Sequence, residues 1–243
     1  MSAKPAGAAK RSPTAAALRR ALREQADADD ARNLARFFQT GPGQYAEGDK
    51  FLGVRVPAVR AIVKANRTAS LRVALAVLTS KWHEERLLAL LLMVQLHQRG
   101  TPEAQLAVFD AYLANVGHID NWDLVDSSAE YIVGPHVDAS NLKLLERLAG
   151  SDHLWSRRIA MLATFHHIKR DDFAPALHIA VRLLNDSHHL IHKAVGWMLR
   201  EIGERDQATL VAFLDAHWVT MPRTAVRYAI EHFTPAARRR YTH

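Results

Sequence analysis

Apolar residues recur every three or four positions along most of this chain, a period that predicts amphipathic helices. The alternation of apolar and polar residues that marks a half-buried strand is nearly absent. The expected helices cover residues 14–26, 28–39, 57–66, 68–79, 81–98, 102–115, 119–133, 139–149, 153–168, 172–184, 187–203, 206–217 and 222–232. The loop-rich segment from Thr40 to Pro57 is expected to be either an irregular connection or a binding loop.

Residues suited to cap helices precede several of these segments, namely Asp29, Ser80, Thr101, Ser151 and Asp186 or Ser187. Glycine and proline separate the segments, for example at Gly100, Gly134-Pro135 and Gly150. Paired helices joined by short turns are typical of an α-solenoid, in which one HEAT-like pair takes about 40 residues. The predicted fold class is therefore all-α, an α-solenoid (superhelix) of HEAT-like antiparallel helix pairs.

The composition fits one soluble domain of this kind. Apolar residues make up 49% of the 243 positions, and the absence of cysteine excludes disulfides and thiol chemistry. No apolar run approaches the ~18 residues of a membrane helix, and the basic, alanine-rich start lacks the apolar core of a secretory signal. We expect a cytoplasmic protein, associated with the nucleoid when bound to DNA, that has no membrane partner.

The net charge of +7 is concentrated at the two ends of the chain. Residues 1–13 and 236–243 carry six of the seven net positive charges and no acid. We expect both segments to be basic tails, the first of them disordered, flanking a single HEAT-like domain over residues 14–235. Such tails suit a polyanion such as nucleic acid, but they also suit simple solubility.

One cation lies within an apolar helix face. In the expected helix 153–168, Met161, Leu162 and Phe165 fall on both sides of Arg158 at about 100° per residue. A guanidinium cannot lose its charge on burial, so it needs an anionic partner or an opening to solvent. Arg158 could therefore be a buried ion-pair member that ties two repeats together, or part of a binding site.

Two tryptophans share a repeat-like spacing with Arg158. Trp122 and Trp197 are 36 positions before it and 39 positions after it, and Asp126 follows Trp122 by one helical turn. Taken singly, each tryptophan would most simply cover core and the aspartate would be solvated. The common spacing instead predicts that the four side chains converge on one concave surface.

The chemistry of this set suits a cationic substrate. Aromatic faces attract cations, a carboxylate stabilises developing positive charge or orients water, and an arginine binds phosphate. A cation beside a phosphodiester describes an alkylated purine in DNA, whose glycosidic bond is already weakened.

Five segments resemble the AlkD-type DNA glycosylases, the HEAT-like DNA alkylation repair family. They are FLGVRVPAVRAIVKAN (51–66), NWDLVDSSAEYIVG, LWSRRIAMLATF, HKAVGWMLREIGERD and MPRTAVRYAIEHF (221–233), and the similarity spans roughly residues 34–235. The resemblance implies a monofunctional DNA glycosylase that releases N3- and N7-alkylated purines from duplex DNA, without base flipping and without a cofactor. The implied partner is double-stranded DNA with alkylated bases, bound by a monomer curved around the duplex.

The resemblance also implies residue roles. Asp126 matches the catalytic carboxylate, Trp122 and Trp197 match the aromatic pair around the lesion, and Arg158 matches the arginine that holds the backbone. Asn121 departs from the pattern, because an aromatic residue is expected there, and this leaves the lesion preference open.

Further residues have open roles. Candidate phosphate contacts are Arg157, Lys193, Arg200, Arg223 and Arg227, for which solvated charge is the alternative. His188, His189 and His192 are more typical of a polar or DNA-facing surface than of a metal site, since no HExxH pattern accompanies them. Trp82, Trp155 and Trp218 are expected to pack.

Two other functions compete with the glycosylase. One is a non-catalytic HEAT-like protein that binds damaged or structured DNA, and the other is a scaffold whose concave face binds a peptide. Release of free base from alkylated DNA would distinguish the enzyme from both.

Overall fold

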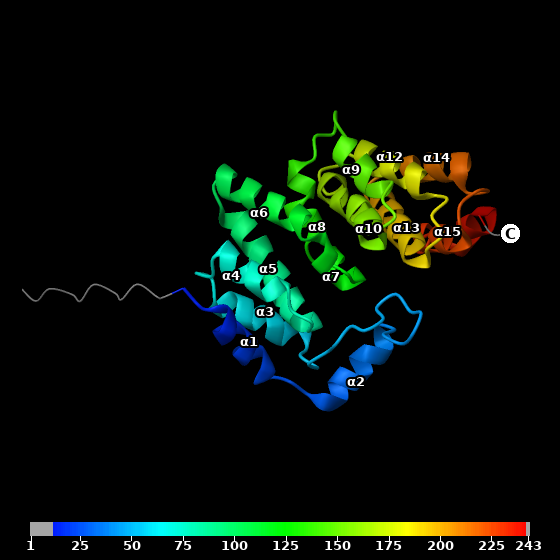
Figure 1. Cartoon of the computed structure of the whole chain (residues 1–243). Coiled ribbons are helices and arrows are strands. Elements are labelled where there is room, and N and C mark those ends of the chain that lie inside the picture. The colour runs from blue at the N-terminus through cyan, green and yellow to red at the C-terminus, as the bar shows by residue number, and fades with distance from the viewer. Residues whose placement is uncertain (1–11, 242–243) are drawn as a thin grey trace, which may run out of the picture. The chain divides into compact units, whose positions relative to one another are not determined.

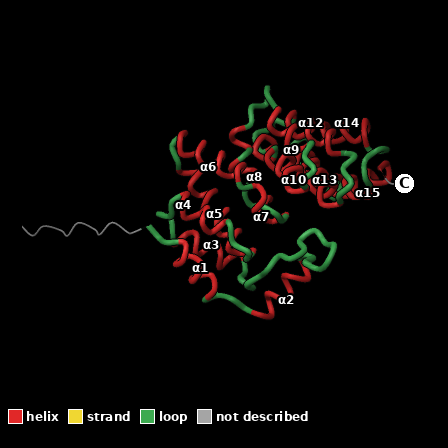
Figure 2. The backbone as a smooth tube through the Cα atoms, viewed as in Figure 1, coloured by secondary structure: helices red, strands yellow, loops and turns green. Residues whose placement is uncertain are grey.

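A computed structural model describes residues 12–241, and within them every regular element is helical (Figures 1 and 2). The predicted all-α class is therefore confirmed. The chain divides into two compact units, one ending at Ala104 and the other beginning at Gln105, and each is described by itself. None of the helices in the described range is long and apolar enough to cross a membrane.

Unit 1 contains α1 (Ala15–Arg23), α2 (Ala28–Phe37), α3 (Val56–Ala65), α4 (Leu71–Leu78) and α5 (His83–Arg99). Helix α5 is its centre, because the run from His83 to Val94 is buried on every face. From Leu87 to Val94 the helix is apolar all round, and such a helix has to be enclosed. Helices α3 and α4 pack against it, and α1 packs against α3 and α4.

The segment between α2 and α3 is an irregular connection fastened to the start of α5 (Figure 2). The buried Glu84 carboxylate accepts hydrogen bonds from the backbone N–H groups of Leu52, Gly53 and Val54 at 2.9, 2.8 and 3.1 Å. Gly53 has a φ of 81° and touches the backbone at Asp27, so a side chain there would be both strained and obstructed. Of the two predictions for Thr40–Pro57, these contacts support the connection.

Unit 2 begins within α6 (Pro102–Ala114) and arranges its later helices in two layers (Figure 1). One layer contains α9 (Lys143–Ala149), α12 (Ala174–Leu183) and α14 (Gln207–His217), and the other contains α10 (Leu154–Ala163), α13 (His189–Gly203) and α15 (Arg223–Ala229). Each helix of the first layer is joined by a short turn to the next helix of the second and packs against that layer. These are the helix pairs that the sequence predicted.

Two helices that the sequence predicts to be continuous are interrupted in the structure. The expected helix 119–133 is broken into α7 (Trp122–Asp126) and α8 (Ala129–Ile132), flanked by the 3₁₀ turns η1 (Val116–His118) and η2 (Gly134–His136). The Ser128 hydroxyl donates to the Leu124 carbonyl at 2.6 Å, and this competes with the helical ladder. Likewise the Thr164 hydroxyl donates to Met161 at 2.6 Å, and α11 (Phe165–Ile168) starts anew after it.

At three helix starts the actual N-cap lies two residues after the expected one. The side chains of Ser80, Ser151 and Asp186 accept from the backbone N–H groups of Trp82, His153 and His188, and these are the actual N-cap residues of α5, α10 and α13. A side chain six positions further on then bonds the carbonyl of the same residue, as Arg86, Arg157 and His192 show. At α2 the cap is Asp27, not Asp29.

The described range, residues 12–241, ends inside both of the expected tails. Residues 1–11 and 242–243 of the expected tails lie outside it. Within it, α16 (Pro235–Arg238) and η3 (Arg239–Tyr241) form short helical turns, and Tyr241 is buried. The limits 14–235 for a single domain stay a prediction.

Candidate active site

Asp126 and Arg158 form a bidentate ion pair in unit 2. Arg158 Nε donates to Asp126 Oδ1 at 2.8 Å, and Nη2 donates to Oδ2 at 2.7 Å. The remaining nitrogen, Nη1, donates to the backbone carbonyl of Leu190 at 2.6 Å. The Arg158 side chain is 5% exposed and that of Asp126 is 15% exposed. The predicted cation inside an apolar face therefore has a carboxylate partner, and that partner is the predicted catalytic residue.

The environment of Asp126 favours its protonated form more than water does. Burial raises the pKa of Asp126 above its ordinary value of 3.8, and the charge and hydrogen bonds of Arg158 oppose that rise. The negative charge of Asp123, three residues earlier, adds to the rise. Because this partly exposed carboxylate is costly to ionise, a nearby cation stabilises its charged form strongly.

Asp126 is positioned by the broken helix described above. It is the last residue of α7, directly before the turn at Ser127 and Ser128. Ser128 is fully buried and hydrogen-bonds the hydroxyl of the fully buried Tyr112 at 3.0 Å. Burial raises the pKa of Tyr112, so its hydroxyl stays protonated and acts as a fixed donor beneath the turn.

Trp122 is the first residue of α7 and is half-buried, one turn before Asp126. Asn121, the departure from the family pattern, is its N-cap: the Asn121 side-chain oxygen accepts from the Trp122 N–H at 2.8 Å, and the residue is fully buried. Asparagine is among the best N-cap residues. Asn121 therefore helps to set where the short helix begins and so where its tryptophan lies.

Trp197 lies in a second cluster, further along α13. Its ring meets Phe165 edge-on at 5.9 Å, and Nε1 donates to Glu201 at 2.9 Å. Two cations lie over the Phe165 ring, Lys169 at 4.2 Å and Arg205 at 6.0 Å. Because Trp197 is seven residues beyond Leu190, it lies about 10 Å further along the α13 axis.

The repeat register explains this separation. Ser151 and Asp186 are equivalent by their capping contacts, and Arg158 and Lys193 each follow them by seven positions. Lys193, half-buried on α13, is therefore the repeat equivalent of Arg158, whereas Trp197 is one turn further on. The spacing of 39 positions between Arg158 and Trp197 is therefore one helical turn longer than the repeat. The sequence signal for the true repeat register is the pattern at the two helix starts, Ser-x-His at Ser151 and Asp-x-His at Asp186.

The other candidate phosphate contacts differ in their ion pairs and in their exposure. Arg157 pairs with Asp186 at 2.5 Å and donates to the carbonyls of Ser151 and Asp152, so it fastens the start of α10 to the start of α13. Arg200 pairs with Glu231. Arg223 and Arg227 are exposed, one turn apart on α15.

The histidine cluster belongs to the start of α13. The His188 ring nitrogen accepts from the Leu190 N–H at 3.2 Å, and the His192 ring contacts the Asp186 carbonyl at 2.5 Å. His189 is exposed and stacks on His188 at 4.8 Å. Over residues 12–241 no three acidic, histidine or cysteine side chains come together as a metal site would require.

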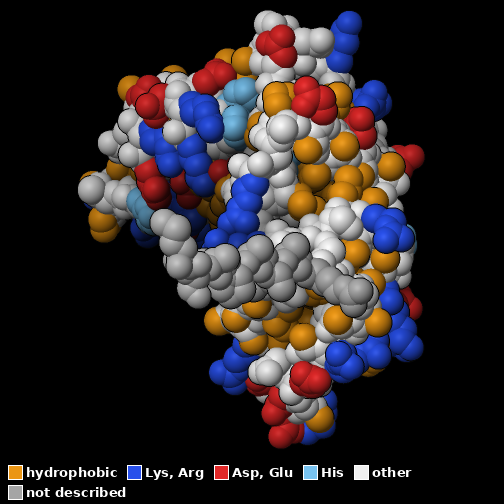
Figure 3. Space-filling model, turned by 90° about the vertical axis from the view of Figure 1, so that its left-hand side faces the viewer, with side chains coloured by type: hydrophobic (Ala, Val, Ile, Leu, Met, Phe, Trp, Pro, Cys, Tyr) orange, Lys and Arg blue, Asp and Glu red, His pale blue; other side chains and the backbone are white. Residues whose placement is uncertain are grey.

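Of the tryptophans expected to pack, Trp155 is 5% exposed, while Trp82 and Trp218 are half-buried. Figure 3 shows Lys and Arg side chains in several groups among acidic and apolar ones.

Comparisons with known proteins agree with the helical architecture. A solved structure from Enterococcus faecalis, titled as a predicted DNA alkylation repair enzyme, superposes with a TM-score of 0.66 at 18% identity, over 87% of this chain and 98% of that chain. A search of the curated proteins found no match. The family model described as DNA alkylation repair enzyme matches residues 18–233. Since that match covers nearly all the described helices, the chain belongs to the DNA alkylation repair enzyme family, as its sequence segments predicted.

Proposed function

We propose that this member of a DNA alkylation repair family is a monofunctional DNA glycosylase, which hydrolyses the N-glycosidic bond of cationic N3- and N7-alkylated purines in duplex DNA. The observation that carries the proposal is the Asp126–Arg158 pair, in which a partly exposed carboxylate is held by both oxygens at the end of a short helix. A group held in place beforehand can stabilise charge that develops during reaction without paying for reorganisation.

In this mechanism the glycosidic bond breaks with both electrons leaving on the alkylated purine, whose positive charge they neutralise. The sugar becomes an oxocarbenium-like cation, and the Asp126 carboxylate stabilises it or orients the water that attacks it. The water oxygen forms the new bond to the sugar carbon and its proton is lost to solvent. Trp122, one turn from Asp126, offers an aromatic face to the cationic base.

Arg158 acts first as the positioning residue of Asp126, because its three nitrogens are directed at that carboxylate and at the Leu190 carbonyl. Its predicted role as a phosphate clamp, and the predicted role of Trp197 at the lesion, stay predictions. Candidate contacts to the DNA backbone are Lys193, Arg223 and Arg227, with Arg157 and Arg200 requiring a change of partner.

The test is incubation with duplex DNA that contains 7-methylguanine, at enzyme in excess of DNA. Free base and an abasic site, appearing with a rate that Asp126→Asn lowers, are expected. Tight binding without release, unaffected by Asp126→Asn, would contradict the enzyme and favour the non-catalytic DNA-binding protein. A DNA affinity that does not change with salt concentration would favour the peptide scaffold, because phosphate contacts release counterions.

A further inference from the structure

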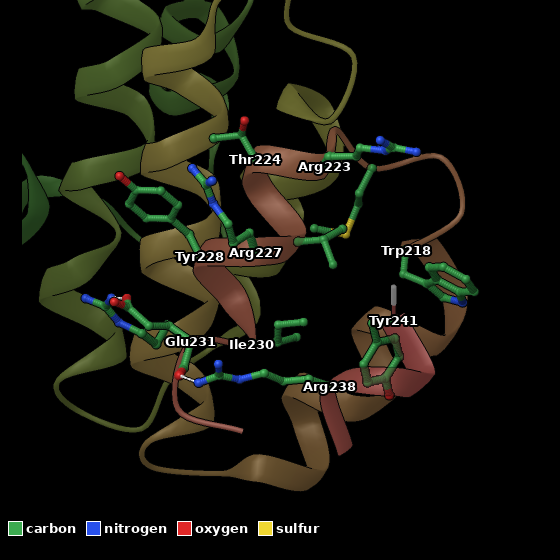
Figure 4. Close-up of a pocket in the computed structure, with 12 residues that line it drawn as sticks. Trp218, Arg223, Thr224, Arg227, Tyr228, Ile230, Glu231, Arg238 and Tyr241 are labelled. Carbon is green, nitrogen blue, oxygen red and sulfur yellow. Dashed lines mark hydrogen bonds and ion pairs between the residues drawn. The ribbon is translucent and has the colours of Figure 1, made fainter. Parts of the chain in front are cut away.

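A cavity of about 760 Å³ lies at the C-terminal end of unit 2, apart from the Asp126 site (Figure 4). Arg200 of α13, the loop after α14, helix α15 and the last helical turns surround it. Arg200 is ten residues beyond Leu190 on the same helix, so it lies about 15 Å further along the axis than the Arg158 contact. The volume of the cavity falls within the range of small-molecule sites, about 300–1,000 Å³.

Four arginines line this cavity: Arg200, Arg223, Arg227 and Arg238. The one acid among its lining residues is Glu231, which already binds Arg200 through its carboxylate and Arg238 through its backbone carbonyl. Arg223 and Arg227 are exposed on successive turns of α15. The cavity therefore has an excess of guanidinium groups, whose planar donors match phosphate oxygens.

The inner surface of the cavity is apolar. Met221, Val226 and Ile230 are 5–6% exposed and lie between the arginines, as Figure 4 shows for Ile230. Tyr228 is half-buried on one side, and the buried Tyr241 on the other side is fixed by a hydrogen bond from its hydroxyl to Asp215 at 2.9 Å. Aromatic and apolar walls of this kind accept the flat face of a ring.

Close packing of two helices sets the position of the cavity wall. Gly196 of α13 lies against α15, where an added Cβ would be 2.5 Å from the Cβ of Tyr228 and closer still to the Ala225 carbonyl. Only glycine allows this approach, which brings Tyr228 and Arg227 beside Arg200.

We propose that this cavity binds a nucleotide, with the base against Met221, Val226 and Ile230 and the phosphate on one of the two exposed arginines, Arg223 or Arg227, which point to opposite sides in Figure 4. A site that only tracked a DNA backbone would need the arginines but not the apolar floor. The same chemistry is offered by a free mononucleotide and by the unpaired, phosphorylated end of a DNA strand. The inference does not rest on the glycosylase activity, because none of these residues contacts Asp126 or Arg158, although Arg223 and Arg227 are also candidate contacts to the DNA backbone.

The test is calorimetric titration of the full chain with 2′-deoxyadenosine 5′-monophosphate, deoxyadenosine, inorganic phosphate and a ten-nucleotide single strand with and without a 5′-phosphate. The mononucleotide or the phosphorylated strand is expected to bind at least ~10-fold more tightly than deoxyadenosine or phosphate alone, since both parts contribute. Tighter binding of the mononucleotide identifies the free ligand, and tighter binding of the phosphorylated strand identifies the strand end. Equal affinity for nucleotide and inorganic phosphate, or no binding of any nucleotide, would overturn the proposal.

Matched double variants locate the site. Arg223→Gln with Arg227→Gln is expected to weaken nucleotide binding by at least ~10-fold, because it removes both arginines that can hold the phosphate. Arg147→Gln with Arg182→Gln removes the same charge from exposed positions on α9 and α12 and is expected to leave binding unchanged. Equal loss in both doubles would show a general charge effect and contradict the assignment. Asp126→Asn should retain nucleotide binding, so a failure of the glycosylase proposal is recognised separately.

Discussion

Unit 1 and unit 2 each bury an aspartate against an arginine, and the two pairs differ in what surrounds the carboxylate. In unit 1, Asp49 accepts from Arg86 at 2.8 Å and from His83 at 2.9 Å, and its side chain is 6% exposed. In unit 2, Arg158 is the only ion-pair partner of Asp126 among the described residues, and the Asp126 side chain is 15% exposed. The Asp49 centre fastens a loop to α5, whereas the Asp126 centre keeps a carboxylate near the surface.

The two carboxylates respond oppositely to their surroundings. Burial alone would raise the pKa of Asp49, but the hydrogen bonds and charges of His83 and Arg86 outweigh it and lower the pKa below 3.8. At Asp126 burial outweighs Arg158, and the pKa is raised. With the same pair of residue types, the pKa of the carboxylate is therefore lowered where His83 joins the arginine and raised where the arginine is the single partner.

The largest effects are expected from removing the arginines. Arg158→Met leaves the Asp126 carboxylate without its cation, which costs about 3–5 kcal/mol in the free energy of unfolding. Arg86→Met removes the arginine from Asp49 but leaves His83, so its cost should be at most of that size. Urea unfolding followed by circular dichroism measures this cost. Base release by the protein that remains folded should fall only for Arg158→Met, and an equal fall for Arg86→Met would erase the distinction between the pairs.

Replacing the aspartates should separate chemistry from stability. Asp126→Asn keeps the size of the side chain and a hydrogen bond to Arg158, and is expected to slow single-turnover base release by about 10²–10³-fold through lost charge stabilisation. Asp49→Asn should lower the urea midpoint while leaving the release rate of the folded protein within about twofold, since surface and structural changes away from the chemistry leave the transition state unaltered. A release rate unchanged in Asp126→Asn would remove the catalytic assignment.

A smaller effect is expected where α13 meets α15. Gly196→Ala introduces a Cβ against Ala225 and Tyr228, and overpacking of this kind costs about 1–3 kcal/mol. Gly117→Ala is the control, because its added Cβ meets nothing within 4 Å and should change stability by less than about 0.5 kcal/mol. Thermal unfolding of both variants measures the difference, and equal stability would argue against the close approach.

The smallest effect concerns pH and follows from the two pKa directions. Asp49 has a lowered pKa, so its contribution to stability is present above pH 3.8 and is lost as the pH falls through its folded pKa. Asp126 has a raised pKa, so its contribution is present below pH 3.8 and is lost as the pH rises through its folded pKa. The destabilisation caused by Asp49→Asn should therefore shrink on acidification and that caused by Asp126→Asn should grow. Urea midpoints between about pH 3 and pH 7 test this, and parallel trends would contradict it.

The sequence predicted the helix pairs well because their signals are local. The apolar period and the caps depend on neighbours within a turn or two, and they located α9 to α15 to within a few residues. The breaks at Ser128 and Thr164 were missed because both hydroxyls turn back onto their own helix, which the apolar period does not reveal. For the site, the pattern identified Arg158 as a buried cation but left its partner open, because Asp126 is brought to it by packing across 32 positions.

The adjacent arginines of α10 point to opposite neighbours. Arg157 reaches forward to Asp186 at the start of α13, and Arg158 reaches back to Asp126 at the end of α7. Inserting or deleting one residue earlier in α10 would rotate both side chains by about 100° and misdirect both pairs together. Length variation among related chains should therefore be excluded from the first turn of α10 and collect instead in exposed turns such as Ser140–Asn141.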